Sequence, residues 1–168
     1  MPSASSAGVN REGCTFGIDC DPYHHHAAIV AADGRGNIEV VEAGLPTGEL
    51  VARVTHLATQ YSGYVVLQGR GPARQYADEI RRTVKVYEYD DAQFADACAR
   101  FFRAVADRKV HVLRHPALTA AVMAATSKPA GDNWRWARDK TETDITTLIA
   151  ATLAHDRATR PNTVWVST

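Results

Sequence analysis

Three aspartates have the residue type and spacing for metal-dependent chemistry, because hard divalent cations bind carboxylate oxygens. Asp19 lies in the apolar run 14–20, where a buried charge is costly unless a cation or hydrogen bonds compensate it. Asp21 would face the same side of a regular strand as Asp19. Asp144 begins the last amphipathic stretch of the chain. We expect Asp19 and Asp144 to lie within roughly 8 Å of each other, close enough to share an ion.

Each of these polar residues also has an ordinary structural interpretation. Asp19 fits a strand-end residue with satisfied hydrogen bonds, and Asp144 fits a residue that caps a helix or interacts with its dipole. Three consecutive histidines, His24, His25 and His26, suggest a metal site at first sight. Adjacent residues of a strand point to opposite faces, so all three cannot ligate one ion. We expect this triplet to be structural or exposed to solvent.

Other kinds of catalytic site have little support in the sequence. No Gly-Lys pair occurs, so a Walker A phosphate loop is absent, and no G-x-S-x-G motif marks a nucleophilic serine. The three cysteines, Cys14, Cys20 and Cys98, form no C-x-x-C pair and are odd in number. This pattern argues against a zinc ribbon and a disulfide framework, and it favours a reducing, intracellular compartment.

The composition describes one domain without a strong electrostatic field. The 168 residues are 45% apolar, and 19 basic residues balance 19 acidic ones. Any basic surface for nucleic acid must therefore be local. No apolar run approaches the roughly 20 residues that a membrane-spanning helix needs. We expect a flexible lead-in over 1–13 and a single domain over 14–168.

The hydrophobic periodicity predicts alternating strands and helices. In the first half we predict strands at 14–20, 26–32 and 37–43, a helix through 50–58, a strand at 64–68, a helix after the Gly-rich turn at 69–71, and a strand at 84–89. In the second half we predict a helix from Asp90 or Asp91 to 105, an extended piece at 110–113, a helix over 115–126, a strand at 134–138, and a helix from about 143 to about 158. The first three strands should form an antiparallel meander, so the fold class is α/β with a mixed sheet.

An aspartate on the first strand of such a meander and another at the start of the last helix form the layout of a two-metal nuclease. With these features the chain resembles the nuclease domain of phage large terminase subunits, which belong to the RNase H-like superfamily. The best segments are GIDCDPYHHHAAIVAA near the start and the region from 91 to 158. The resemblance implies an RNase H-like mixed sheet with helices on both faces and an endonuclease that cuts DNA during genome packaging.

The resemblance also implies a set of metal ligands. Such nucleases hold two divalent ions, Mg²⁺ or Mn²⁺, with carboxylates on the first strand, at the end of the strand after the first helix, and on the last helix. Asp19 matches the first position and Asp144 the last, with Asp21 or Asp139 as further ligands. The middle position falls on Gln68, whose neutral amide supplies an oxygen but no charge, so binding of the second ion should weaken. Alternatively, the third carboxylate comes from Glu79, Glu88 or Asp90.

The expected partners follow from the same resemblance. They are double-stranded DNA, the terminase ATPase domain, the small terminase subunit and the portal, in the cytoplasm of a bacterial host, with no membrane contact. Basic residues near the site would bind DNA phosphates without reading sequence. The candidates are Arg70, Arg74, Arg135, Arg138 and Lys140. Trp134 and Trp136 share one face of their strand, where core packing is favoured over base stacking.

Two other functions remain open at this stage. One is a non-catalytic RNase H-like module that binds DNA or packaging partners. The other is an independent junction-resolving nuclease, which would dimerise and carry a more basic face.

Overall fold

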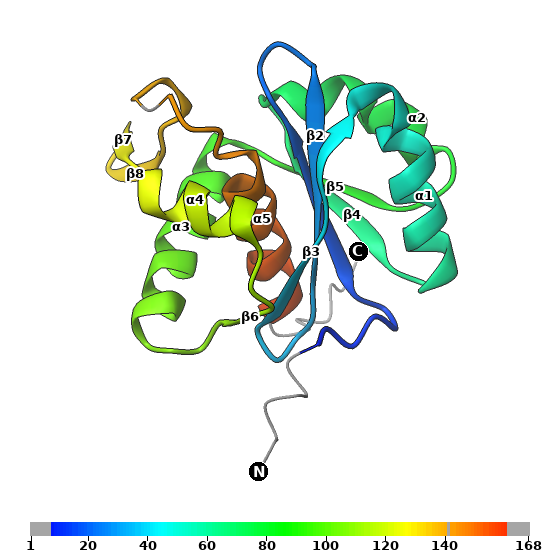
Figure 1. The fold of residues 1–168 in the computed structure, drawn as a ribbon, viewed down its shortest axis with the longest axis horizontal. Coiled ribbons are helices and arrows are strands. Elements are labelled where there is room, and N and C mark those ends of the chain that lie inside the picture. Colours follow the sequence, from blue (N-terminus) through cyan, green and yellow to red (C-terminus); the bar gives the residue numbers. More distant parts are fainter. Residues whose placement is uncertain (1–7, 141, 161–168) are drawn as a thin grey trace, which may run out of the picture.

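A six-stranded mixed sheet forms the centre of the protein (Figure 1). The computed structural model describes residues 8–140, without the side chain of Lys140, and residues 142–160. Across the sheet the strands are β5 (Val86–Tyr89), β4 (Tyr64–Gln68), β1 (Thr15–Cys20), β2 (His26–Ala32), β3 (Asn37–Pro46) and β6 (His111–Val112). Strands β1, β2 and β3 are antiparallel neighbours, whereas the β1–β4, β4–β5 and β3–β6 pairs are parallel.

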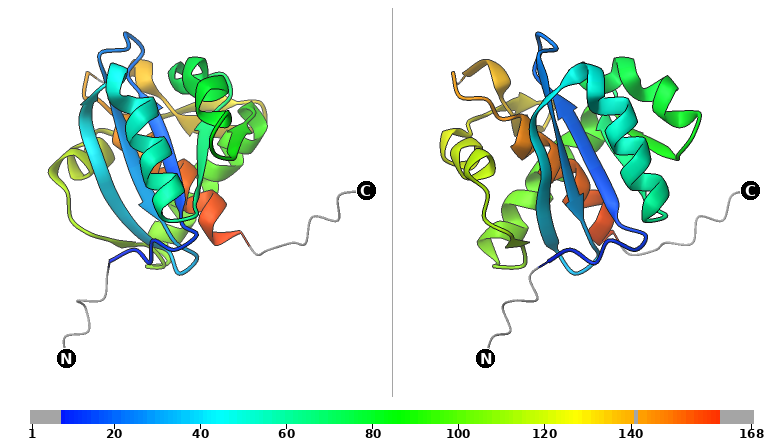
Figure 2. Two further views of the ribbon diagram at one scale, coloured as in Figure 1. Left: turned by 90° about the vertical axis from the view of Figure 1, so that its right-hand side faces the viewer. Right: turned by 45° about the vertical axis from the view of Figure 1, so that its right-hand side comes forward.

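Helices cover both faces of this sheet (Figures 1 and 2). One face is covered by α1 (Leu50–Gln60) and α2 (Ala77–Arg81). The other face is covered by α3 (Asp91–Ala106), α4 (Pro116–Ala124) and α5 (Thr146–Thr159). Two separate apolar clusters, one on each side of the sheet, form the core. The layers are those of an α/β fold.

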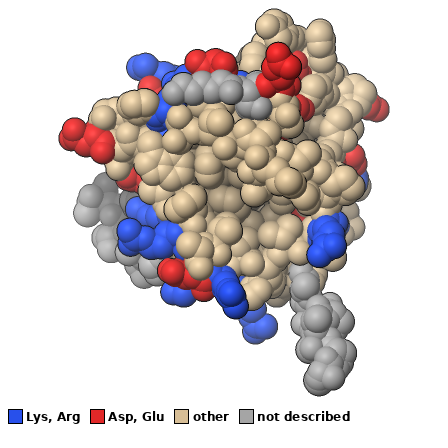
Figure 3. Space-filling model, turned by 60° about the vertical axis from the view of Figure 1, so that its left-hand side comes forward, with Lys and Arg blue, Asp and Glu red and all other residues tan. Residues whose placement is uncertain are grey.

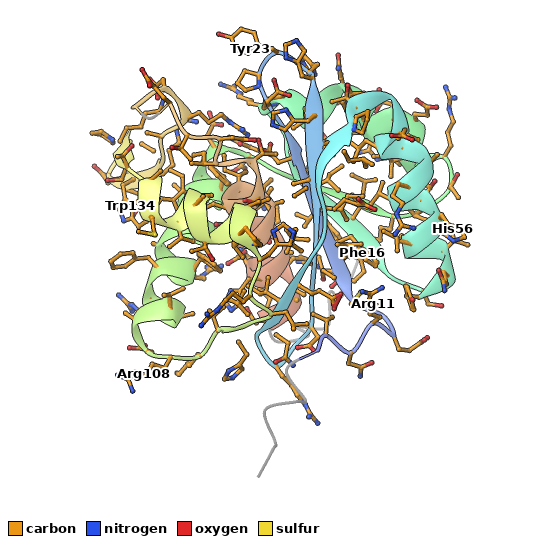
Figure 4. The ribbon with its side chains drawn as sticks, in the orientation of Figure 1. Arg11, Phe16, Tyr23, His56, Arg108 and Trp134 are labelled. Carbon is orange, nitrogen blue, oxygen red and sulfur yellow. The ribbon has the colours of Figure 1, made fainter. Side chains whose placement is uncertain are left out.

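The alternation of β1 decides which side chains can meet α5. Phe16, Ile18 and Cys20 belong to the apolar cluster on the α1 side, where Figure 4 labels Phe16. Successive side chains of a strand point to opposite faces, so Gly17 and Asp19 face α5. Gly17 has no Cβ, which lets α5 lie directly on β1. A Cβ there would lie 2.1 Å from the Ala150 carbonyl oxygen.

Helix α5 is enclosed by other elements, because every residue from Thr146 to Asp156 is buried. The strands lie on one side of it, and α3, α4 and the strand β8 (Asn133–Trp136) lie on the other. The Trp136 indole donates a hydrogen bond of 3.0 Å to the Thr152 hydroxyl. Trp134 packs edge-on against Trp136, with 4.9 Å between ring centroids. The two indoles therefore pack together against the core, as the sequence predicted.

Most predicted elements are confirmed with shifts of a few residues at their ends, and three differences concern the region after α4. Strands β2 and β4 have the predicted bounds, and Asp90 caps α3 through a capping box with Gln93. Strand β7 (Ser127–Ala130) was not predicted, because Pro129 and Gly131 are typical of a break. Strand β8 pairs with β7 in a separate two-stranded sheet instead of joining the main one. Helix α5 begins at Thr146 instead of 143, so Asp144 precedes the helix.

The described part of the predicted lead-in is attached to the domain. Asn10 donates a backbone hydrogen bond of 2.9 Å to the Asp33 carboxylate, and Gly13 donates one of 2.7 Å to the Tyr61 carbonyl. The three cysteines are buried and free. Among the described helices, none is long and apolar enough to cross a membrane.

Candidate active site

The candidate site lies where two parallel strands end on the α5 side of the sheet. Gly17 of β1 is in register with Val66 of β4, and two residues further along each strand stand Asp19 and Gln68. Val66 belongs to the cluster on the α5 side, so Gln68 faces the same side as Asp19. Asp19 is 1% exposed and Gln68 is 5% exposed. The carboxylate and the amide are therefore neighbours beneath the surface.

Arg138 is the partner of the Asp19 carboxylate. Its Nη2 lies 2.6 Å from Asp19 Oδ1, and its Nη1 donates to the Cys20 carbonyl at 3.3 Å. The second oxygen, Asp19 Oδ2, is buried without a hydrogen-bond partner. Burial raises the pKa of Asp19 above its ordinary value, although the Arg138 charge opposes this shift. A buried carboxylate with one oxygen unpaired is energetically costly, and a divalent cation in place of Arg138 would compensate that cost more fully.

Asp144 approaches the same place from the segment before α5. Its Oδ2 contacts the Nε2 of His26, and its Oδ1 accepts a hydrogen bond of 2.8 Å from the Thr146 backbone. Burial would raise its pKa, but the bonds from Thr146 and the His26 contact outweigh burial and lower it. The charge of Asp144 contributes to the raised pKa of Asp19 and to the raised pKa of Arg138. The two carboxylates thus lie on one side of the sheet, with Arg138 within electrostatic reach of both.

The Asp21 carboxylate forms hydrogen bonds within the turn that joins β1 to β2. Its carboxylate accepts backbone hydrogen bonds from Tyr23 at 3.1 Å, His25 at 2.7 Å and His26 at 2.8 Å. Burial would raise the pKa of Asp21, but these donors outweigh it and hold the pKa below its ordinary value. The strand does not remain regular past Cys20, which was the condition for Asp21 to face the ion with Asp19.

Gln68 lines a cavity of about 330 Å³ next to the Asp19–Arg138 pair. Its Oε1 packs against Gly71, where an added Cβ would lie only 3.0 Å away. Asp139 lies at the rim of the same cavity, mostly exposed, with a contact of 3.1 Å to Lys128. A second hollow of about 410 Å³, which His26 and Asp144 line, lies beside the other carboxylate.

The alternative sources of a third carboxylate have other contacts. Glu88 pairs with Arg74 at 2.6 Å and also with Arg81, while Asp90 accepts from the Gln93 backbone at 2.7 Å. Glu79 is exposed on α2. Within residues 8–140 and 142–160, no group of three His, Cys, Asp or Glu side chains is placed to hold a metal ion. The site as described has two carboxylates, Asp19 and Asp144.

The basic residues near the site have different environments. Arg70 is 82% exposed and lies 3.5 Å from Asp91, whereas Arg74 pairs with Glu88. Arg70, Arg135 and Arg138 line the cavity that contains Gln68. The side chain of Lys140 lies outside the described residues. Together with Lys128, the three arginines give this cavity four basic side chains against the single acid Asp139.

Three residues of this region were not predicted individually from the sequence. His26 was judged with its neighbours and not as a partner of Asp144, 118 positions away. Lys128 lies on the unexpected strand β7, directly opposite Arg135 of β8. Thr146 donates its backbone N–H to the Asp144 side chain two positions earlier, just before α5, and this Asx-turn spacing was readable from the sequence.

A buried thiol and an apolar hollow lack the properties of a reaction centre. Burial raises the pKa of Cys20 to about 12, which keeps this thiol protonated and a poor nucleophile. A hollow of about 510 Å³ lies between α3 and α4 and is lined mainly by apolar side chains such as Phe102 and Met123. Figure 3 shows this side of the molecule, with charged residues mostly around the edge. Neither Asp19 nor Asp144 lines this apolar hollow.

The arrangement of the sheet and its helices defines an RNase H-like α/β fold, and solved structures share it. No protein-family model and no curated protein matches the sequence. The large terminase nuclease from thermophilic phage G20c superposes with a TM-score of 0.66 at 15% identity, over 86% of this chain and 81% of that one. A structure of the G20c nuclease with bound cobalt gives a TM-score of 0.64 at 13% identity.

Two further structures agree. The nuclease domain of the large terminase from Thermus phage P74-26 gives a TM-score of 0.62 at 14% identity, over 92% of this chain and 93% of that one. The HK97 bacteriophage large terminase gives 0.65 at 13% identity, over 93% of this chain but only 42% of its own length. The chain therefore has the fold of the nuclease domain of phage large terminases.

Proposed function

We propose that this chain is a divalent-metal-dependent DNA endonuclease domain of the large-terminase type, which cuts DNA during genome packaging. The observation that supports the proposal is that the charge of Asp144 acts on Asp19 from the same side of the sheet, with Asp19 Oδ2 buried and without a hydrogen-bond partner. The fold supports the same class of activity.

The donors present fit one divalent ion. Mg²⁺ commonly binds one or two carboxylates and completes its shell with water and substrate phosphate oxygens. Asp19 and Asp144 would hold it, and Mn²⁺ accepts the same oxygen ligands. The two ions that the sequence suggested need more negative charge than these carboxylates supply, since Gln68 stands at the middle position. A second ion would therefore depend on oxygens from the DNA itself.

The chain's own residues would bind and orient the substrate. When bound, a divalent ion supplies an activated water and stabilises the leaving oxygen of a phosphodiester. His26 and Thr146 hold the Asp144 carboxylate in place through its two oxygens. Arg70, Lys128 and Arg135 surround the adjacent cavity, which suits a negatively charged DNA backbone. Because these contacts would involve phosphates only, cleavage should be independent of sequence and should weaken with salt.

One observation favours a second candidate function. Arg138 neutralises Asp19, and the described residues offer no third acidic ligand. A non-catalytic module that retains the RNase H-like fold and binds DNA or packaging partners would have these properties. The ATPase domain, the small subunit and the portal remain the proposed partners in either case.

Nicking of supercoiled plasmid tests the proposed activity. The wild type should nick DNA in millimolar Mn²⁺ or Mg²⁺, and a chelator should stop it. Asp19→Asn and Asp144→Asn should abolish nicking, whereas Asp107→Asn, the same change at the exposed end of α3, should not. Circular dichroism verifies that each variant is folded. DNA binding without nicking at any metal concentration would support the non-catalytic module instead.

A further inference from the structure

The guanidinium of Arg138 stands where a cation would bind Asp19. It contacts two oxygens, the Asp19 carboxylate at 2.6 Å and the Cys20 carbonyl at 3.3 Å. Carboxylate and main-chain carbonyl oxygens are also the ligands that hard divalent cations bind. We propose that Arg138 competes with the divalent cation for Asp19, so that metal binds only when this guanidinium is displaced. This inference rests on the proposed function, because it concerns the same metal site.

The burial of the pair explains why one cation must replace the other. Asp19 is 1% exposed, and the side chain of Arg138 is 21% exposed. A buried carboxylate without a positive partner is strongly unfavourable, so Asp19 keeps Arg138 until another cation arrives. An arginine is always charged in proteins, and its positive charge beside a divalent ion is repulsive. Asp19 therefore cannot bind Arg138 and a divalent ion strongly at the same time.

The displaced side chain has a place to go. Arg138 lines the cavity of about 330 Å³ that also contains Arg70 and Arg135. A DNA phosphate in this cavity would offer the guanidinium a new anionic partner, since arginine binds phosphate through two parallel hydrogen bonds. The site would then bind metal well only when DNA is present, which restrains the nuclease in its absence.

Removing Arg138 should change the metal affinity in opposite directions, depending on whether this arginine competes with the ion or positions Asp19. If Arg138 only positions Asp19, its removal weakens metal binding, because the ligand loses its orientation. If Arg138 competes, its removal strengthens metal binding, because a repulsive charge and an occupying group both disappear. From the repulsion between a single and a double charge about 4 Å apart in water, we expect Arg138→Gln to bind Mn²⁺ roughly 30-fold more tightly.

Mn²⁺ affinity should be measured by isothermal titration calorimetry and by electron paramagnetic resonance, without DNA. The variants are Arg138→Gln, Arg138→Lys and Asp19→Asn, with Arg103→Gln on the exposed last turn of α3 as the control of equal charge change. Arg138→Lys keeps the charge but loses the two-pronged contact, so its gain should be smaller. Arg103→Gln should bind as the wild type does, and Asp19→Asn should bind no Mn²⁺.

Thermal unfolding gives a second measurement that needs no activity. In chelator, Arg138→Gln should melt below the wild type because Asp19 is left unpaired, and Mn²⁺ should raise its melting temperature more than that of the wild type. If Arg138→Gln does not fold, Arg138→Lys carries the test with the same expected sign. One outcome would overturn the competition but not the metal site. In it the wild type binds Mn²⁺ and Asp19→Asn does not, but the Arg138 variants bind Mn²⁺ no more tightly than the wild type. Mn²⁺ binding that is absent throughout, or unaffected by Asp19→Asn, would overturn both this inference and the proposed metal site.

Discussion

Replacing Gln68 by aspartate should supply the acidic ligand that the site lacks. Gln68 ends β4 beside Asp19 on the α5 side of the sheet and lines the cavity that Arg138 borders. A carboxylate here would place a third negative charge near the ion-binding oxygens. We expect Gln68→Asp to strengthen Mn²⁺ binding and to increase nicking at subsaturating Mn²⁺.

The magnitude follows from the charge and the burial. Unit charges 4 Å apart in water interact by about 1 kcal/mol, so a divalent ion would gain about 2 kcal/mol, or roughly 30-fold in affinity. Gln68 is 5% exposed, so without metal the new carboxylate is desolvated at a cost on the order of several kcal/mol. A domain of this size loses about 2–4 °C in melting temperature for each kcal/mol. Gln68→Asp should therefore melt lower in chelator and recover in Mn²⁺.

The matched control is Gln68→Asn, which shortens the side chain equally but adds no charge. Plasmid nicking and melting temperature should be measured for both variants and the wild type over one Mn²⁺ titration. If Gln68→Asp and Gln68→Asn behave alike, position 68 is not a ligand position and the reasoning fails. Strong wild-type nicking with no gain in Gln68→Asp would show that the ligand set is already complete.

Three further predictions concern the scaffold that positions the site. Gly17→Ala should destabilise the fold by about 1–3 kcal/mol or more, because the new Cβ would clash with the α5 backbone. In thermal melts the control Gly48→Ala, whose new Cβ has nothing within 4 Å, should melt as the wild type does. Asp156→Asn should cost about 2–3 kcal/mol in urea unfolding, since this buried carboxylate accepts from Tyr89 at 2.7 Å and pairs with two arginines; an unchanged midpoint would contradict it. Burial would raise the pKa of Asp33, but the hydrogen bonds that its carboxylate accepts outweigh burial and lower this pKa. The ionised carboxylate therefore stabilises the fold above the unfolded pKa of about 3.9, and this stabilisation is lost as the pH falls through the folded pKa. Asp33→Asn should accordingly melt below the wild type near neutral pH, and the difference should vanish in strong acid.

Local sequence patterns were sufficient for the main elements. The apolar runs of β2 and β4 predicted their bounds, and an aspartate at position 90 or 91 marked the start of α3. These signals are local, because strand alternation, helical periodicity and capping involve residues within a few positions of each other. The order of these elements, with Asp19 on the first strand and Asp144 near the last helix, was enough to suggest the nuclease fold.

Contacts that residue patterns alone do not reveal determined the rest. Strand β7 exists through its pairing with β8, which local turn residues such as Pro129 concealed. Asp21 turned towards the backbone of its own hairpin, because irregular turn geometry, not strand alternation, governs its side chain. Arg138 reaches Asp19 across 119 positions. The sequence thus determined which side chains were available for chemistry, whereas packing of α5 and its preceding segment against β1 determined their charge partners, because burial and pairing depend on groups that only folding brings together.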